Sequence, residues 1–212
     1  MPSSILSTYN RTKISFNRGK GCYLISKNGK KYLDFTSGIA VNSLGHCNDF
    51  LIKALHEQSK KLWHCSNAFE ILEQEKLAKK LTQLTFADKV FFCNSGAEAV
   101  EASIKIARAY FQILKRKNKY KIITIKGSFH GRTLATITAS GQDKLLDGFK
   151  PKVDGFEHVN FGDHDAIEKA IDNKTAAIMI EPILGEGGIK VVPPQCLEGL
   201  RKLCNKKNIL LI

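Results

Sequence analysis

The sequence predicts an α/β fold in which helices cover both faces of a mostly parallel sheet. The first observation is that, from about residue 88 onward, apolar runs of strand length alternate with segments of helical periodicity. The second is that these runs are continuously apolar, as expected of strands that are buried on both faces. With 212 residues, of which 43% are hydrophobic, the chain has enough apolar surface to form such a core.

A small antiparallel element is predicted near the N-terminus. Residues 19–36 contain two short runs with β character, CYLIS and KYLDF, on either side of Lys27-Asn28-Gly29-Lys30. Asn-Gly between two such runs is a strong short-range signal for a hairpin. We therefore expect a β-hairpin ahead of the α/β region.

From about residue 48 the periodicity becomes helical, and later it alternates. Apolar residues at steps of three and four predict two amphipathic helices, around 50–55 and 72–84. The clearest helix, 95–116, has one apolar stripe formed by Ala97, Val100, Ile104, Ala107, Phe111 and Leu114. The expected strands are residues 88–93, 121–126, 175–180 and 208–212, and the remaining expected helices are 164–172 and 195–207.

The net charge of +13 comes mostly from lysines that are scattered along the chain. A nucleic-acid-binding protein more often clusters its charge, mixes arginine and aromatic residues into the cluster, and has a recognisable module. We therefore expect the lysines to lie on solvated helix faces, and we expect no nucleic-acid partner. The positive field could still favour a small anionic ligand.

The cysteines and the N-terminus indicate a cytoplasmic protein without a metal site. Cysteines at positions 22, 47, 65, 93, 196 and 204 form no C-x-x-C pair, so neither a disulfide framework nor a zinc site is expected. The first residues, MPSSILSTYNRTK, lack the apolar stretch of a signal peptide, and no window has the length of a membrane span. We expect free thiols and no membrane partner.

Ser95-Gly96-Ala97-Glu98 lies where an expected strand gives way to the clearest helix. Free backbone N–H groups and the helix dipole favour an anion at such a junction, and Gly96 and Ala97 have almost no side chain to keep a phosphate away. Ser95 and Glu98 also fit the S-x-x-E capping box, which needs no ligand. On this segment alone, both interpretations stay open.

Two later motifs also follow expected strands, so they should reach the carboxyl edge of the sheet, where open α/β folds bind ligands. In SFHGRT, residues 128–133, Phe129 could stack on a planar ligand and Arg132 could bind a carboxylate through two hydrogen bonds. In EPILGEGG, residues 181–188, two carboxylates lie among glycines. The alternatives are an ordinary glycine turn and solvated loop acids. His130 has no assignable carboxylate partner, which favours a positioning role.

Four segments together resemble the class III, or ornithine-type, aminotransferases that use pyridoxal 5'-phosphate. They are SGIAVNSLGH (37–46), FFCNSGAEA (91–99), SFHGRT and EPILGEGG. The likeness runs from about residue 10 to the last residue, and within the family it is greatest to the acetylornithine subgroup. It implies the large domain of fold type I, here incomplete at its C-terminus, over residues 47–212. An N-terminal segment of residues 1–46 with the hairpin would precede it, and the complete enzyme would be a homodimer.

The resemblance also implies roles for individual residues. The backbone at Gly96 and Ala97 would hold the cofactor phosphate, with Ser95 beside it. Phe129 would cover the pyridine ring of the cofactor. Arg132 would receive a carboxylate of the substrate.

Glu186 matches a glutamate that pairs with a second arginine in this family and helps one pocket accept two substrates. The implied reaction passes the side-chain amino group of N-acetylornithine, or of a related amine, to 2-oxoglutarate and forms glutamate. Such a reaction belongs to arginine biosynthesis. Pyridoxal phosphate would act as the electron sink.

The resemblance further implies groups that this sequence does not supply. The family forms a Schiff base on a lysine and keeps the pyridine nitrogen protonated with an aspartate, and both would follow the strand NILLI at 208–212. No catalytic residue is therefore assignable, and we expect these residues to be the N-terminal part of an aminotransferase, inactive alone. The alternatives are a class III enzyme for ornithine, succinylornithine, 4-aminobutyrate or succinyldiaminopimelate, and a truncated non-catalytic remnant.

Overall fold

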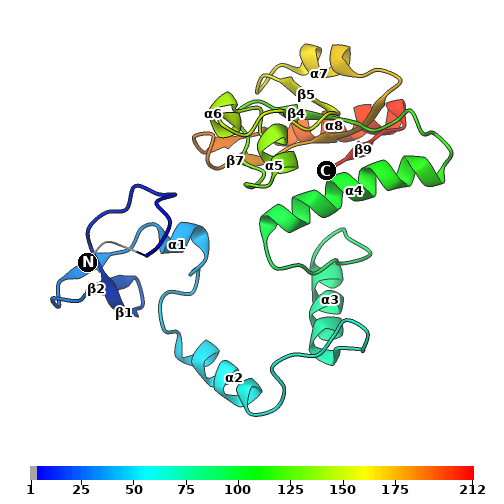
Figure 1. Cartoon of the computed structure of the whole chain (residues 1–212). Coiled ribbons are helices and arrows are strands. Elements are labelled where there is room, and N and C mark those ends of the chain that lie inside the picture. Colours follow the sequence, from blue (N-terminus) through cyan, green and yellow to red (C-terminus); the bar gives the residue numbers. More distant parts are fainter. Residues whose placement is uncertain (1–3) are drawn as a thin grey trace. The chain divides into compact units, whose positions relative to one another are not determined.

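The computed structural model describes residues 4–212, which fall into two compact units (Figure 1). The first unit ends at Lys80, and the second covers Leu81–Ile212. The first contains a small antiparallel sheet, and the second contains a parallel sheet with helices. The domain boundary at residue 46 that the resemblance implies stays a prediction.

The sheet of the first unit has three antiparallel strands in the order β1-β2-β3. They are β1 (Phe16–Lys20), β2 (Tyr23–Ser26) and β3 (Lys31–Leu33). The predicted hairpin is confirmed, since Ile25 of β2 pairs with Lys31 of β3 and Gly29 in the turn has a φ of 86°. Glycine adopts this backbone conformation without steric cost. The sequence analysis did not predict β1.

The segment after β3 contains a left-handed turn. Four consecutive residues, Ser37–Ala40 (α1), have φ values between 47° and 65°, which non-glycine residues rarely adopt in succession. Asp34 holds the entry to this turn, because its carboxylate accepts the N–H groups of Thr36 and Ser37, each at 3.0 Å, and lies 2.8 Å from Nε2 of His46. Hydrogen bonds from the Thr36 hydroxyl and from His46 lower the pKa of Asp34 to about 2.

The two predicted helices of this region are confirmed as α2 (Asp49–Ser59) and α3 (Leu72–Leu84). Asn48 caps α2, since its side-chain oxygen accepts the N–H of Phe50 at 3.1 Å and the N–H of Leu51 at 3.3 Å. The structure describes both helices in full, and none of their residues is buried. Their apolar faces are therefore exposed in this chain.

The second unit has a four-stranded parallel sheet in the order β5-β4-β6-β9, built from β4 (Lys121–Ile125), β5 (Phe156–Val159), β6 (Thr175–Met179) and β9 (Leu210–Leu211). Central strand β4 places Ile123 opposite Glu157 of β5 and opposite Ile178 of β6. The expected strands at 121–126, 175–180 and 208–212 are confirmed, and so is the α/β class. The sequence analysis missed β5.

The helices of this unit alternate with the strands of the parallel sheet along the chain, beginning with a helix ahead of β4. The predicted ones are confirmed as α4 (Gly96–Ile113), α7 (His164–Ala170) and α8 (Pro194–Lys207). Further short elements were not predicted, namely α5 (Leu134–Ala139), α6 (Asp143–Leu146) and the pair β7 (Ile183–Leu184) and β8 (Lys190–Val191).

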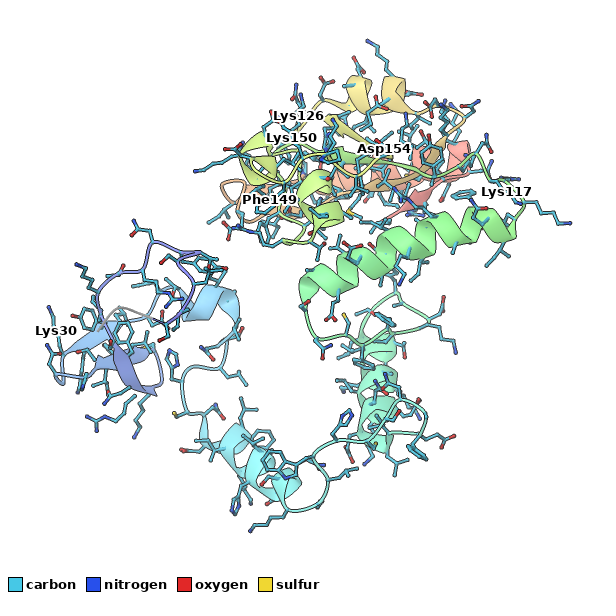
Figure 2. All side chains as sticks on the ribbon, viewed as in Figure 1. Lys30, Lys117, Lys126, Phe149, Lys150 and Asp154 are labelled. Carbon is cyan, nitrogen blue, oxygen red and sulfur yellow. The ribbon has the colours of Figure 1, made fainter. Side chains whose placement is uncertain are left out.

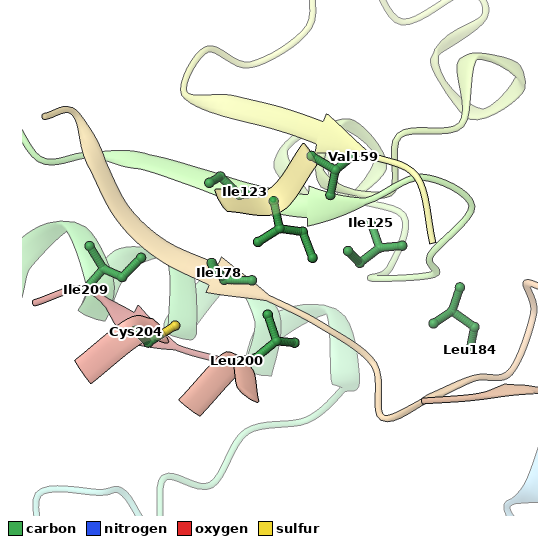
Figure 3. Close-up of a cluster of buried hydrophobic side chains, with 9 residues drawn as sticks. Ile123, Ile125, Val159, Ile178, Leu184, Leu200, Cys204 and Ile209 are labelled. Carbon is green, nitrogen blue, oxygen red and sulfur yellow. The ribbon is translucent and has the colours of Figure 1, made fainter. Parts of the chain in front are cut away.

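Side chains of successive strand residues point to opposite faces of the sheet, and each face packs against different helices. On one face, Ile123 and Ile178 form a buried cluster with Leu200 of α8 (Figure 3) and with residues of α7. On the other face, Ile122 and Ala177 pack with residues of α4. The sheet is thus covered on both faces, which explains why its strands read as continuous apolar runs.

Residues 88–93, which the sequence predicts as a strand, form no strand. A strand is stabilised by hydrogen bonds to a neighbouring strand, and among residues 4–212 no strand pairs with this segment. Phe91 is accordingly 66% exposed. The apolar run leads into Ser95 without forming a strand.

Three lysines labelled in Figure 2, Lys30, Lys117 and Lys126, are exposed and lie in separate loops. Within the described part of the chain, no helix has the length and apolar character that would be needed to cross a membrane.

Candidate active site

Helix α4 begins at Gly96 with Ser95 as its N-cap. The Ser95 backbone is extended, and its Oγ accepts the N–H of Glu98 at 3.2 Å. The Glu98 carboxylate accepts the side-chain amide of Asn94 at 3.3 Å and its backbone N–H at 2.7 Å, and these bonds lower the pKa of Glu98. The capping interpretation of this segment is therefore confirmed, with the carboxylate reaching the residue before the cap.

The cap leaves two donors of the α4 N-terminus available. Among the hydrogen bonds of the described residues, none is donated by the N–H of Gly96 or of Ala97. A Cβ added at Gly96 would meet no atom within 4 Å, so the space beside it is open. Since the helix has 18 residues, its N-terminus also carries the positive end of a substantial dipole. Capping and anion binding are thus compatible here.

Gly131 brings the loop after β4 against the start of α4. Its φ is 125°, and a Cβ at this position would lie 2.8 Å from Cβ of Ala97 and 2.9 Å from Oγ1 of Thr136. Only glycine fits so close an approach. Thr133, the N-cap of α5, also donates a 2.5 Å hydrogen bond to Glu101 of α4. The loop with Phe129 and its neighbours is therefore fixed next to the α4 N-terminus.

Phe129 and Arg132 lie together on the solvent side of this loop. The guanidinium carbon of Arg132 is 5.5 Å from the centroid of the Phe129 ring, within the range of a cation–π contact. Phe129 is 37% exposed, and Arg132 is exposed. An aromatic face and a five-donor cation are therefore both accessible to a ligand at this edge.

The loop that begins at Glu181 is joined to the Phe129 loop through backbone groups. A Cβ on Gly187 would lie 2.9 Å from the carbonyl oxygen of Gly127. The Glu181 carboxylate accepts the N–H of Phe129 at 2.6 Å and the N–H of Gly185 at 3.3 Å. All three motifs therefore meet at the carboxyl ends of β4 and β6.

Glu186 is exposed in the same loop. The structure gives it no ion pair or hydrogen bond among residues 4–212, so it does not pair with Arg132. One connected group is formed by the start of α4, Phe129 and Arg132. Glu186 lies in the neighbouring Glu181 loop and, in the described part of the chain, has no bond to this group. The ligand-binding roles of all these residues stay predictions.

His130 points into the protein. The residue is 6% exposed, and its backbone N–H donates a hydrogen bond to Oγ of Ser140 at 3.2 Å. Its ring Nε2 has no hydrogen-bond partner in the described residues. Burial lowers the pKa of His130, Glu181 opposes this shift and His158 adds to it. A neutral imidazole is expected at pH 7, and the positioning role of His130 stays a prediction.

The sequence analysis missed the groups that hold the loops in place. Ser140 and Gln142 support the loop from the side of α5, since Gln142 donates its side-chain amide to the carbonyl of Ser128 at 2.7 Å. Glu101 and Glu181 bind it from α4 and from the third motif. Glu181 was expected at the ligand edge of the sheet because it directly follows a buried strand, but its bond to the Phe129 loop was not predicted.

Comparison with known proteins extends over nearly the whole chain. The family model described as "Aminotransferase class-III" matches residues 6–212. The acetylornithine aminotransferase of Mesorhizobium japonicum is 54% identical over 99% of this chain and 53% of its own length. The acetylornithine aminotransferase of Prochlorococcus marinus is 47% identical over the whole chain and 52% of its own length.

Solved structures of aminotransferases have the same fold as this chain. The ornithine aminotransferase of Toxoplasma gondii ME49 has a TM-score of 0.92 and 32% identity, over 98% of this chain and 50% of its own. A second structure of the T. gondii enzyme is described with partial occupancy of PLP at the active site. The omega transaminase of Pseudomonas jessenii in complex with PMP has a TM-score of 0.85 and 30% identity, over 93% of this chain and 49% of its own.

The chain spans about half the length of the curated relatives it matches. The family match, in contrast, includes every motif of the candidate site, from Ser95 to the loop with Glu186. The chain therefore belongs to the class III aminotransferase family.

Proposed function

We propose that these 212 residues are the N-terminal part of an aminotransferase that transfers the side-chain amino group of N-acetylornithine to 2-oxoglutarate, with pyridoxal 5'-phosphate as cofactor. The observation that carries the proposal is the meeting of the α4 N-terminus, the Phe129 loop and the Glu181 loop at one sheet edge. The choice of N-acetylornithine is supported by relatives of that name at 47 to 54% identity. The pathway would be arginine biosynthesis.

The residues present at this edge fit the chemistry of the cofactor. Two available N–H groups at the helix N-terminus, at Gly96 and Ala97, suit a phosphate, and the open space beside Gly96 leaves room for it. The Ser95 hydroxyl lies next to them as the cap. The accessible face of Phe129 suits a pyridine ring.

The substrate would be held by side chains on the same edge. Arg132 presents a planar fork of donors to a carboxylate of either substrate. Glu186, exposed and unpaired in the described residues, would be available to an arginine from elsewhere in the protein. When bound, pyridoxal phosphate supplies an electron sink. It stabilises the negative charge that forms on the carbon bearing the amino group when a bond of that carbon breaks.

We propose that the lysine that binds the cofactor and the aspartate that pairs with its ring nitrogen come from parts of the protein outside these residues. No lysine in this sequence matches the family motif for that role. The polypeptide of residues 1–212 is then inactive alone.

Three further properties are part of the proposal. The complete enzyme is a homodimer, which would cover exposed apolar residues of the first unit such as Phe35 and Trp63, 91% and 87% exposed in this chain. Its location is the cytoplasm. Its partners are small molecules, with no nucleic acid or membrane among them.

The test is a comparison of amino donors with the complete protein. The purified protein, loaded with pyridoxal phosphate, is given 2-oxoglutarate and one of N-acetylornithine, ornithine, succinylornithine, 4-aminobutyrate or succinyldiaminopimelate, and glutamate formation is measured. We expect kcat/KM for N-acetylornithine to exceed that for ornithine by about tenfold or more, because a pocket shaped for an acylated amine leaves the extra ammonium charge unpaired. A higher value for another donor would replace the proposed substrate, and no glutamate from any donor would contradict the proposed activity.

A further inference from the structure

We propose that Glu181 is a positioning residue that holds the backbone of Phe129 and thereby fixes the aromatic ring against the cofactor. The inference rests on the proposed function, because it takes Phe129 as the residue that covers the cofactor ring. It assigns Glu181 no contact with substrate or cofactor. Its role is to join two loops, one with Phe129 and one with Glu186.

The two oxygens of Glu181 serve two different loops. Oε1 accepts the N–H of Phe129 at 2.6 Å, across 52 residues of sequence, and Oε2 accepts the N–H of Gly185 at 3.3 Å. A hydrogen bond from a backbone N–H to an ionised carboxylate is shorter and stronger than one between neutral groups. One half-buried side chain therefore connects the segment after β4 to the segment after β6.

Among the described residues, each of the backbone N–H groups of Ser128, Phe129 and His130 has one acceptor, and the acceptor of Phe129 lies in the Glu181 loop. The N–H of Ser128 is donated to Ile125 O at 3.3 Å, within its own turn, and the N–H of His130 is donated to Ser140 Oγ at 3.2 Å. The Phe129 N–H has Glu181 as its acceptor. Without that carboxylate, the middle residue of the loop would lose its only hydrogen bond to another segment among the described residues.

The Phe129 side chain belongs to neither of the two buried hydrophobic clusters of the second unit. It is 37% exposed, and its ring centroid lies 5.5 Å from the guanidinium carbon of the exposed Arg132. An aromatic ring that must lie flat on a planar ligand therefore needs a rigid backbone to set its direction. The hydrogen bond from the Phe129 N–H to Glu181 provides that rigidity.

The chemistry of the acceptor explains why a glutamate is required. Glutamine has one acceptor oxygen, and its NH₂ group would face one of the two N–H donors. Glu181→Gln therefore loses at least one of the two bonds while it keeps the size of the side chain. Aspartate keeps both oxygens but withdraws them by one methylene group.

The first experiment measures hydrogen exchange in the complete protein without cofactor. Peptides that contain Phe129 and Gly185 are compared by mass spectrometry between wild type, Glu181→Gln and Glu198→Gln. Glu198 is an exposed glutamate of α8 and serves as the charge-matched control. We expect exchange of the Phe129 or Gly185 amide to be at least about tenfold faster in Glu181→Gln, as the loss of a charge-assisted bond implies. Unchanged exchange at both amides would overturn the inference.

The second experiment is a double-mutant cycle on cofactor affinity. Dissociation constants for pyridoxal phosphate are measured by absorption titration for wild type, Glu181→Gln, Phe129→Ala and the double variant. We expect Glu181→Gln to weaken binding about tenfold in the wild-type background and to have almost no effect once Phe129 is alanine. Additive losses would show that Glu181 does not act through Phe129 and would overturn the inference.

The two experiments separate this inference from the proposed function. If the wild type binds no pyridoxal phosphate, the proposed function is wrong, and the exchange data still decide whether Glu181 holds the two loops. If Glu181→Gln does not fold, as judged by its circular dichroism spectrum, Glu181→Asp is measured in the same way. The global unfolding temperature is recorded for each variant. A purely structural role of Glu181 would lower this temperature, while the effects of Glu181→Gln and Phe129→Ala on cofactor affinity would remain additive.

Discussion

At the scale of single residues, the candidate site depends on how Arg132 is presented. Its guanidinium lies over the Phe129 ring at 5.5 Å, and the residue is exposed. The ring restricts the guanidinium to one side of the loop without forming an ion pair that a substrate would have to displace. The planar fork is therefore available for a bidentate carboxylate contact.

We expect Arg132→Lys in the complete enzyme to raise KM for the carboxylate substrates about tenfold, because a lysine ammonium cannot make the two parallel hydrogen bonds of the fork. Steady-state kinetics with both substrates measure the effect. Arg116→Lys, which changes an exposed arginine after α4 in the same way, is the control. Unchanged constants for both substrates in Arg132→Lys would remove Arg132 from the site.

His130 gives the folded state a dependence on pH. Its ordinary pKa of 6.5 is lowered in the folded protein, chiefly by burial. As the pH falls below that ordinary value, the unfolded chain binds a proton that the folded chain does not yet bind. Stability is therefore lost as the pH falls from 6.5 toward the lowered pKa of the folded state.

We expect His130→Asn to flatten this acid dependence. Unfolding temperatures are measured between pH 5 and pH 8 for both proteins, and the slopes are compared, since the variant also changes the absolute stability of a buried position. The wild type should lose more stability than the variant below about pH 6.5. Parallel curves would contradict the assignment of a buried, neutral His130.

At the scale of elements, one lysine ties three segments of the second unit together. Nζ of Lys121 on β4 lies 2.5 Å from the Glu157 carboxylate on β5, 2.9 Å from the Asp172 carboxylate and 2.8 Å from the carbonyl of Ala170 at the end of α7. Burial alone would lower the pKa of Lys121, but the bonds to Glu157 and Asp172 outweigh it and raise the pKa. The Lys121 side chain is only 14% exposed.

We expect Lys121→Met to lower the free energy of unfolding by about 2 kcal/mol, because three acceptors lose a charged donor. The control is Lys76→Met in α3, where the pair with Glu73 has side chains 70% and 69% exposed. That exposed pair should contribute less than about 1 kcal/mol. Urea unfolding of both variants measures the two losses of unfolding free energy. Equal losses would show that the bonds of Lys121 contribute no more than an exposed surface ion pair.

The sequence predicted the elements whose signal is local. The apolar stripe of α4, the Asn-Gly turn and the continuous strand β6 have periodicities that a short window contains. It missed β5, whose four residues FEHV include a glutamate and a histidine and are held by pairing with β4. It was wrong about 88–93, because strand formation also needs a neighbour that no local pattern shows.

At the scale of the whole chain, the buried core lies in the second unit. Apart from Ser26, the buried residues among 4–212 all belong to Leu81–Ile212. The largest cluster is formed by side chains from the sheet, α7 and α8, with Ile178 fully buried (Figure 3). The stability of the described chain therefore depends mainly on this sheet and its helices.

We expect Ile178→Ala to lower the free energy of unfolding by about 3 kcal/mol and Ile178→Val by about 1 kcal/mol, since both leave a cavity and the first is larger. Ile113→Ala, at a position 80% exposed, should change it by less than about 0.5 kcal/mol. Thermal or urea unfolding provides the comparison. A similar loss at both positions would contradict a core centred on Ile178.

The site, unlike the core, was predicted from the order of motifs along the chain. Three segments that follow strands were expected at one sheet edge, and the Gly131 contact with Ala97 and the Glu181 bond to Phe129 bring them together. What the sequence did not show is which groups make those contacts, because pairs 34 or 52 residues apart have no common pattern. The local sequence around Gly131 is compatible with an ordinary glycine turn, and only the structure shows its close approach to Ala97.

The central claim is that the start of α4 holds the phosphate of the cofactor, and Gly96→Asp tests it most directly. An aspartate at the first turn of a helix is compatible with folding and favourable to the helix dipole, and a Cβ at this position meets no other atom within 4 Å. Dissociation constants for pyridoxal phosphate and for pyridoxal, which lacks the phosphate, are measured in the complete protein for wild type, Gly96→Asp and the neutral control Gly96→Asn. We expect Gly96→Asp to weaken pyridoxal phosphate binding about a hundredfold through charge repulsion, with little change for pyridoxal and a smaller loss in Gly96→Asn. Wild-type affinity for pyridoxal phosphate in a folded Gly96→Asp protein would contradict the account.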